Sequence, residues 1–145
     1  QVTTDRGTIL EARSLPGPTG ESNRWTTHPR GTILCLGPDA ADAARQAEQA
    51  STKGCAAVSI APGAAIDGTL DPDTLRGLTG FTAVAYRAGG SHARALRKAL
   101  TARAGPILPL LTGANIAAAC VLERHVCTDT TAAGGNATLI AASGL

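Results

Sequence analysis

The feature that most constrains this fold is the alternation of short apolar runs with helix-like segments between residues 31 and 111. The apolar runs span residues 32–36, 55–60, 81–86 and 107–111. Short, continuously apolar runs are typical of parallel strands that are covered on both faces. Because strands that alternate with helices favour right-handed crossovers, the sequence predicts an α/β fold with a Rossmann-like, open and mostly parallel sheet and flanking helices.

The first helix is expected after the break at Gly37-Pro38-Asp39, where the carboxylate of Asp39 is suited to cap a helix. Alanines recur behind it at helical spacing and form a small-residue face, while the polar side chains between them are expected to point elsewhere. The alanines are Ala40, Ala43, Ala44, Ala47 and Ala50, and the polar residues are Asp42, Arg45, Gln46, Glu48 and Gln49. A face of alanines allows this helix to lie close to the sheet.

The clearest helical pattern covers residues 91–104, and Gly105-Pro106 is expected to end it. Its inward residues are Ala93, Leu96 and Leu100. A shorter helix is expected around Asp73 to Leu78, where Asp71-Pro72 provides a start signal. Pro109 lacks a backbone donor, which predicts that the last apolar run lies at a sheet edge or is irregular.

The chain is expected to divide into three parts around a single core, which its 145 residues are sufficient to build. Residues 1–30 are rich in Thr, Pro, Gly and charge and are interpreted as a linker or wrapping segment, although composition alone equally allows a flexible chain end. Residues 31–116 form the predicted Rossmann-like domain. Residues 117–145 are expected to contain a strand, beginning near Ala117, followed by a docking motif.

The C-terminal stretch from Val126 to Leu139 begins with β-branched residues and then becomes small and polar. It carries too little apolar surface to hold a shape by burying its own side chains. We therefore predict an extended C-terminal arm that docks on another surface. The motif residues are Thr130, Ala132, Ala133, Gly134, Gly135, Asn136, Ala137, Thr138 and Leu139.

Composition argues against several classes of partner. A net charge of +2 with one Trp, one Tyr and one Phe disfavours nucleic-acid binding. No apolar stretch approaches the roughly 20 residues that span a bilayer. Because the chain begins at Gln1 without a signal sequence, we expect a piece of a longer polypeptide. Its cysteines form no Cys-x-x-Cys pair, which favours a reducing, cytoplasmic setting.

The cysteines are the first candidates for a chemical site in this sequence. Cys35 and Cys55 lie in strand-like apolar runs, where a thiol usually behaves as a small buried hydrophobe. Their spacing does not suit zinc, so no metal site is predicted. Cys127 and His125 are the only Cys/His neighbourhood, and a reactive pair there would require a lowered thiol pKa. No catalytic residue is predicted.

The first turn of the predicted sheet opposes a dinucleotide. It lacks Gly-x-Gly-x-x-Gly, Pro38 removes an amide donor, and Asp39 places a carboxylate where a pyrophosphate would lie. A second loop with Gly89, Gly90 and Ser91 precedes a basic helix and is a candidate anion site. An ordinary loop beside a solvated basic face explains it more simply, and a small-molecule or nucleotide-binding module is the alternative.

Two motifs near the chain ends resemble the C-terminal region of the proline utilization A family. One is the entrance motif Pro16, Gly17, Pro18, Thr19, Gly20 and Glu21, and the other is the Thr-Ala-Ala-Gly-Gly-Asn-Ala-Thr-Leu sequence that ends at Leu139. The pair Glu123-Arg124 also resembles the family's approach to its terminal motif. Asp129 and Thr131 depart from the family pattern, and residues 141–145 extend beyond its usual end.

The resemblance implies a domain of unknown function from the aldehyde dehydrogenase superfamily, within a bifunctional enzyme that combines proline dehydrogenase and aldehyde dehydrogenase activities. Such a domain has a Rossmann-like fold without a cofactor, while FAD and NAD are expected in the parent enzyme. The implied partner is an aldehyde dehydrogenase domain of the same or a neighbouring chain. The implied role is non-catalytic: a lid over the tunnel that carries pyrroline-5-carboxylate, or its hydrolysed semialdehyde, between two active sites.

Overall fold

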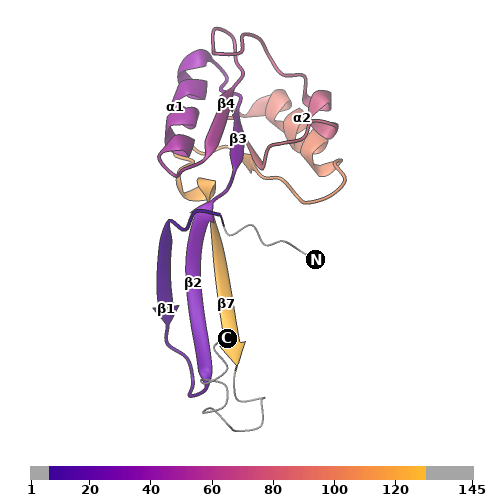
Figure 1. The fold of residues 1–145 in the computed structure, drawn as a ribbon. Helices are drawn as coiled ribbons and strands as arrows, with labels where there is room; N and C mark the ends of the chain where they lie inside the picture. The colour runs from indigo at the N-terminus through magenta and orange to yellow at the C-terminus, as the bar shows by residue number, and fades with distance from the viewer. Residues whose placement is uncertain (1–6, 130–145) are drawn as a thin grey trace. The chain divides into compact units, whose positions relative to one another are not determined.

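A computed structural model describes residues 7–129 of the chain (Figure 1). The described residues divide into two compact units, Pro29–Val121 and a second unit made of residues 7–28 and 122–129. Within the described part, no helix is both long and apolar enough to cross a membrane.

The Pro29–Val121 unit contains a four-stranded parallel sheet in the order β4-β3-β5-β6. Its elements along the chain are β3 (Thr32–Cys35), α1 (Ala40–Ser51), β4 (Ala56–Ser59), the 3-10 helix η1 (Pro72–Arg76), β5 (Ala83–Ala85), α2 (Gly90–Thr101), β6 (Leu110–Leu111) and the 3-10 helix η2 (Ala118–Cys120). Helices flank the sheet, as Figure 1 shows for α1 and α2. The predicted Rossmann-like α/β fold is confirmed.

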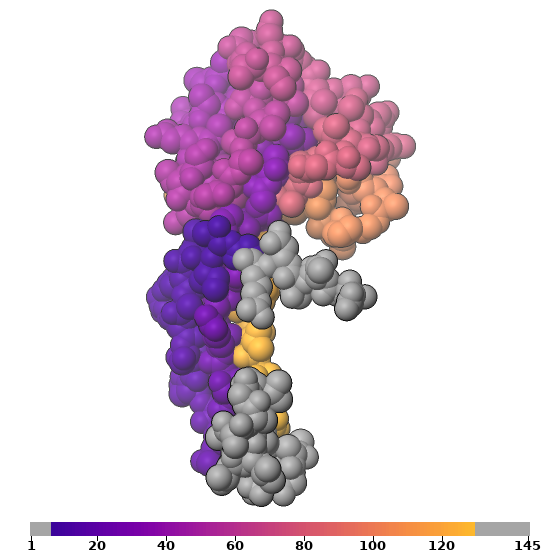
Figure 2. Space-filling view, in the orientation of Figure 1, coloured from indigo at the N-terminus to yellow at the C-terminus, as the bar shows by residue number. Residues whose placement is uncertain are grey.

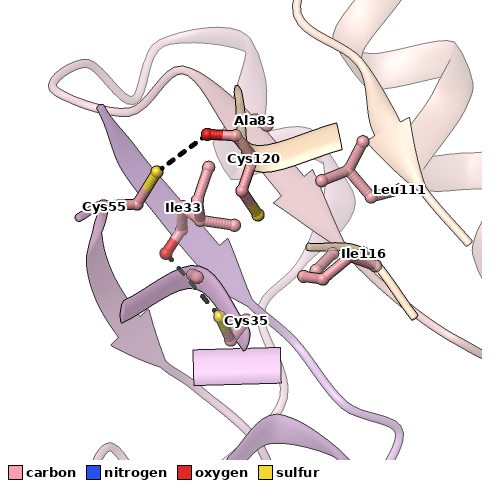
Figure 3. Close-up of a cluster of buried hydrophobic side chains, with 9 residues drawn as sticks. Ile33, Cys35, Cys55, Ala83, Leu111, Ile116 and Cys120 are labelled. Carbon is pink, nitrogen blue, oxygen red and sulfur yellow. Dashed lines mark hydrogen bonds between the residues drawn. The ribbon is translucent and has the colours of Figure 1, made fainter. Parts of the chain in front are cut away.

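Strand β3 supplies side chains to both sides of this sheet because successive residues of a strand point to opposite faces. Ile33 and Cys35 pack in one buried cluster with Ala50 of α1, and Figure 3 shows part of this cluster. Leu34 packs in the other cluster with Leu96 of α2. The continuous apolar run therefore marks a strand covered on both faces, as its sequence predicted.

Both predicted helix starts are confirmed. The Asp39 carboxylate accepts a hydrogen bond of 2.9 Å from the Asp42 amide at the start of α1. Asp71 does the same for the Asp73 amide at the start of η1, at 3.1 Å. Short polar side chains satisfy amides that the first helical turn leaves without partners, so local sequence suffices to locate these ends.

The small-residue face of α1 differs from its prediction at two positions. Ala44 is exposed, whereas Gln46, expected to point away, is only 5% exposed. The Gln46 side-chain oxygen accepts a hydrogen bond of 3.1 Å from the Gly37 amide. This bond gives the buried side-chain oxygen a partner, whereas the buried side-chain nitrogen has none among the described residues.

The later strands are shorter than their apolar runs. The run from Phe81 to Tyr86 contributes only β5, and the run from residue 107 contributes only the two residues of β6. Ile107 is 91% exposed, so it does not belong to the sheet core. Strand β6 is an edge strand, as Pro109 predicted, and the Pro109 carbonyl accepts a hydrogen bond from the Val84 amide.

The second unit contains a three-stranded sheet, β1-β2-β7, built from β1 (Glu11–Leu15), β2 (Glu21–Pro29) and β7 (Val121–Asp129). Strands β1 and β2 form an antiparallel pair. The linker or wrapping segment expected over residues 1–30 therefore contains regular strands in its described part. Residues 118–120, expected to begin a strand, form η2 instead.

Candidate functional site

The turn after β3 is the place where an open parallel sheet would bind a nucleotide, because β4 and β5 lie on opposite sides of β3. Gly37 has a φ of +72°, and a Cβ built there would lie 2.4 Å from the Asp39 carbonyl oxygen. Glycine is therefore required by the turn itself, whether or not a ligand approaches.

The polar groups of this turn are bonded within the chain. The Gly37 amide donates to Gln46, and the Gly37 carbonyl accepts from the Arg87 amide at 3.1 Å. Asp39 caps α1 with the carboxylate that accepts from the Asp42 amide. Groups that a phosphate would need as donors are thus already engaged, and a carboxylate occupies the positive end of the helix.

An ion pair connects the loop after β5 to helix α1. The guanidinium of Arg87 lies 2.8 Å from the Asp42 carboxylate, which also accepts from Arg45 at 2.9 Å. The Asp42 side chain is 13% exposed. This pairing keeps the Arg87 charge close to the protein's own carboxylate, where it neutralises Asp42 rather than a bound anion.

A cavity of about 230 Å³ lies beside this turn, at the carboxyl end of the sheet. Its walls include Leu36, Pro38 and Ile60, and the rings of Tyr86 and His92 contribute a tilted aromatic contact with centroids 5.0 Å apart. The cavity is smaller than a typical small-molecule pocket of about 300 to 1,000 Å³. It offers room only for a small group.

The Gly89-Gly90-Ser91 loop stands at the start of α2, where the structure shows no side-chain cap. Gly90 has a φ of +84°, a conformation that glycine adopts readily. Arg94 and Arg97 line the same depression as Gly89 and Gly90, together with Arg87. The loop is therefore basic and open, and its use as an anion site stays a prediction.

The entrance motif of residues 16–21 forms the connection between β1 and β2. Gly20 has a φ of +88°, and the Glu21 amide donates to the Pro18 carbonyl at 3.1 Å. The Glu21 carboxylate accepts from the Asn23 side chain at 2.5 Å. The motif thus has a local structural role in a hairpin turn, and its docking role stays a prediction. The C-terminal docking motif of residues 130–139 lies outside the described residues.

The cysteines divide into three buried thiols and one exposed thiol. Burial raises the pKa of Cys35 from 9.0 to about 12 and that of Cys120 to about 11. The Cys55 thiol, also buried, donates to the Cys120 carbonyl at 3.1 Å (Figure 3). The expected burial of Cys35 and Cys55 is confirmed, and protonated thiols in a core are poor nucleophiles.

The exposed thiol of Cys127 does not have the electrostatic setting of a reactive cysteine. Its pKa is raised, first by a hydrogen bond with Glu21, then by slight desolvation and by the charges of Glu21 and Asp129. A raised pKa lowers the thiolate fraction, which opposes the Cys127–His125 pair. Elsewhere in residues 7–129, no cluster of three His, Cys, Asp or Glu side chains has the arrangement to hold a metal ion.

Two features were not predicted from the sequence: the Arg87–Asp42 ion pair beside the β3 turn, and the three-stranded sheet itself. Arg87 and Asp42 are 45 positions apart, so no local spacing indicates their pairing. The β-branched and aromatic residues around Trp25 were a strand signal that the neighbouring prolines and glycines obscured.

The chain matches curated proteins along most of its own length, although no family model matches it. It is 31% identical over 158 residues to the bifunctional protein PutA of Escherichia coli (strain K12), covering 94% of this chain and 12% of that protein. It is 32% identical over 146 residues to the bifunctional protein PutA of Salmonella typhimurium, covering 88% and 11%. The chain thus spans only about a tenth of the length of these curated relatives.

Solved structures agree with these alignments. A structure of proline utilization A (PutA) with proline bound in remote sites has a TM-score of 0.56 and 25% identity, over 70% of this chain and 13% of that one. A crystal structure of a PutA mutant from Bradyrhizobium japonicum has the same TM-score and identity, over 69% and 13%. The sequence and structural similarities together show that this chain is homologous to one segment of the bifunctional protein PutA.

Proposed function

We propose that this chain is a non-catalytic domain of a bifunctional enzyme that converts proline to glutamate. In this role it seals a substrate-channelling tunnel and braces a neighbouring aldehyde dehydrogenase domain, of the same or a second chain. The homology to PutA over 94% of the chain supports the assignment to such an enzyme. FAD and NAD belong to the catalytic parts of the proposed parent, and this domain requires neither.

The observation that carries the non-catalytic role is the state of the β3 turn. A fold that ordinarily presents free amides to a pyrophosphate here bonds the Gly37 amide to Gln46 and the Asp42 amide to Asp39. Displacing either partner would leave a buried or helix-terminal polar group without its bond, at a cost of about 1 to 3 kcal/mol for the buried one. The turn therefore favours a structural use of the fold.

The three-stranded sheet supports the bracing role. All five residues of β1 are exposed, and β7 is exposed from Leu122 to Asp129. Apolar side chains are among them: Leu15, Leu122 and Val126 are 40%, 43% and 49% exposed. A sheet that exposes apolar side chains in this way is suited to packing against a neighbouring domain.

The tunnel-sealing role is tested in the longer polypeptide by deleting residues 130–145. Proline is supplied, and NADH is followed from the first seconds of the reaction. The intact protein is expected to form NADH without delay, whereas the deletion variant shows a lag because the intermediate escapes to bulk solvent. Activity with externally added pyrroline-5-carboxylate is the control, since it reports whether the dehydrogenase site itself is intact. Immediate NADH formation by the deletion variant would exclude tunnel sealing.

A second candidate function, binding of a small molecule, is favoured by one observation. The basic depression at Gly89 and Gly90 combines an uncapped helix start with the side chains of Arg94 and Arg97. Calorimetric titration with nucleotides and acidic metabolites tests this candidate, with Arg94→Gln/Arg97→Gln as the variant expected to lose the signal. Absence of saturable heat across the panel would leave the structural role alone.

A further inference from the structure

The three-stranded sheet separates its charges between its two faces. One face contains a groove of about 370 Å³. The groove is lined by Ile9, Arg24, Thr26, His28, Arg124 and Val126. Arg24, Thr26 and His28 alternate along β2, and Arg124 and Val126 alternate along β7, so each set shares one face of its strand. The groove is therefore both basic and apolar.

No carboxylate lies beside these cations among the described residues of this face. Strand β1 places Ser14 opposite Arg24 and Ala12 opposite Thr26, and both are uncharged. The Thr26 hydroxyl donates to the Arg124 carbonyl at 3.5 Å, which ties β2 to β7 beneath the groove. In the part of the chain that the structure describes, neither Arg24 nor Arg124 makes an ion pair.

The opposite face has a different composition. By alternation along the strands it carries the acidic residues Glu11, Glu21, Glu123 and Asp129. Arg13 on that face pairs with Glu11, and its guanidinium lies 5.5 Å from the ring centroid of Trp25. The arginine of the acidic face is thus neutralised by Glu11, whereas the guanidinium groups of Arg24 and Arg124 have no carboxylate partner within residues 7–129.

We propose that the groove face docks an extended protein segment that carries Asp or Glu carboxylates beside apolar side chains. Each free guanidinium offers a planar fork of donors that matches a carboxylate. Ile9 and Val126, 47% and 49% exposed, would pack against the apolar side chains of that segment. This inference rests on the proposed bracing role and specifies the chemistry of the surface that is braced.

Charge favours this acidic segment over two other possible occupants of the groove, a second copy of the chain and the chain's own end residues. An isologous pairing of two copies through this face would bring Arg24 and Arg124 against the same cations of the second copy, which is repulsive. Of the chain's own ends, residues 130–145 contain no Asp or Glu, and residues 1–6 contain Asp5 beside Arg6 and so carry no net side-chain charge. An acidic segment of a different domain is the complementary partner.

The test uses the 145-residue chain and a fluorescent peptide of alternating Glu and Leu, with fluorescence anisotropy as the readout. Binding is expected to weaken at least about tenfold in Arg24→Glu/Arg124→Glu, because two attractive contacts become repulsive. The matched control is Lys53→Glu/Lys98→Glu, which reverses two charges in the Pro29–Val121 unit, outside the groove, and is expected to change the affinity less than about twofold. A Lys-Leu peptide of the same length should not bind.

Circular dichroism melts establish that both charge-reversed variants fold, and Arg24→Gln/Arg124→Gln provides a milder change of the same groove. Equal weakening in the two double variants, or no binding of the acidic peptide to the unaltered chain, would overturn the proposal. Dimerisation of the chain that the groove variants abolish would also overturn it, in favour of a second copy. The sealing role fails separately: peptide binding that depends on the groove, combined with no NADH lag on deletion, contradicts only the sealing role.

Discussion

The two compact units of this chain use their strands in opposite ways. In the Pro29–Val121 unit, β3 is covered on both faces, with Ile33 and Cys35 fully buried on one side and Leu34 nearly so on the other. In the second unit, β1 and most of β7 are exposed, and Figure 2 shows β7, in yellow, at the surface. The comparison shows that the α/β unit contains strands covered on both faces, whereas the three-stranded sheet leaves β1 and most of β7 uncovered.

The largest expected effect is a difference in the free energy of unfolding between two leucine truncations, one in each unit. Leu96→Ala removes a fully buried side chain from α2 and is expected to lower the free energy of unfolding by about 2 to 5 kcal/mol. Leu122→Ala removes a side chain that is 43% exposed and is expected to cost less than about 1 kcal/mol. Urea denaturation followed by circular dichroism measures both. Similar losses would show that the sheet is itself a core element.

A smaller but still clear loss is expected at the β3 turn. Gly37→Ala is expected to cost about 1 to 3 kcal/mol, because the backbone has a positive φ and the new Cβ would meet the Asp39 carbonyl. Gly77→Ala is the matched control, since its φ is −106° and no atom lies within 4 Å of the added Cβ. Equal urea midpoints for the two variants would contradict the described turn.

The buried thiol of Cys35 makes the stability of the Pro29–Val121 unit depend on pH in the alkaline range. The folded-state pKa of Cys35 is raised from 9.0 to about 12, so the unfolded chain loses this proton first. Stability is therefore expected to be unaffected below about pH 9 and to fall as the pH rises from 9 towards 12. Cys35→Ala should show a shallower fall than the unaltered chain, measured by urea titrations across this range. A parallel fall in both proteins would contradict burial of this thiol as its cause.

The smallest effect is expected at an exposed ion pair of the three-stranded sheet. Arg13→Ala removes the contacts with Glu11 and the Trp25 ring, yet the Arg13 side chain is 65% exposed. Because water screens such pairs, the expected loss is within about 1 kcal/mol. Thermal unfolding measures it, and a loss as large as that of Leu96→Ala would indicate that this sheet face is not solvent-exposed in solution.

Sequence reasoning identified the α/β unit because its signals are local. The run from Thr32 to Leu36 had to be covered on both faces, and Asp39 and Asp71 mark helix starts through bonds to amides two or three residues away. Burial of Gln46 escaped prediction because its partner, the Gly37 amide, is set by the fold. A polar side chain gives no sequence signal that it will be buried with a partner.

The three-stranded sheet was harder to predict because its strands pair over long distances and bury little. Strand β2 pairs with β7, about 100 positions later in the chain, and Thr26 bonds to Arg124 across them. With both β1 and β7 exposed, these strands lack the apolar pattern of a covered strand. The charge difference between the faces appears only after the register is known.

The central claim is that the nucleotide-binding turn of this fold is filled by the chain's own groups. Hydrogen exchange at the Gly37 and Asp42 amides, measured by NMR with and without NAD, tests it most directly. The account predicts that both amides are protected in the free chain, through Gln46 and Asp39, and that NAD leaves their exchange rates unchanged. Rapid exchange at these amides that slows on addition of NAD would contradict the claim.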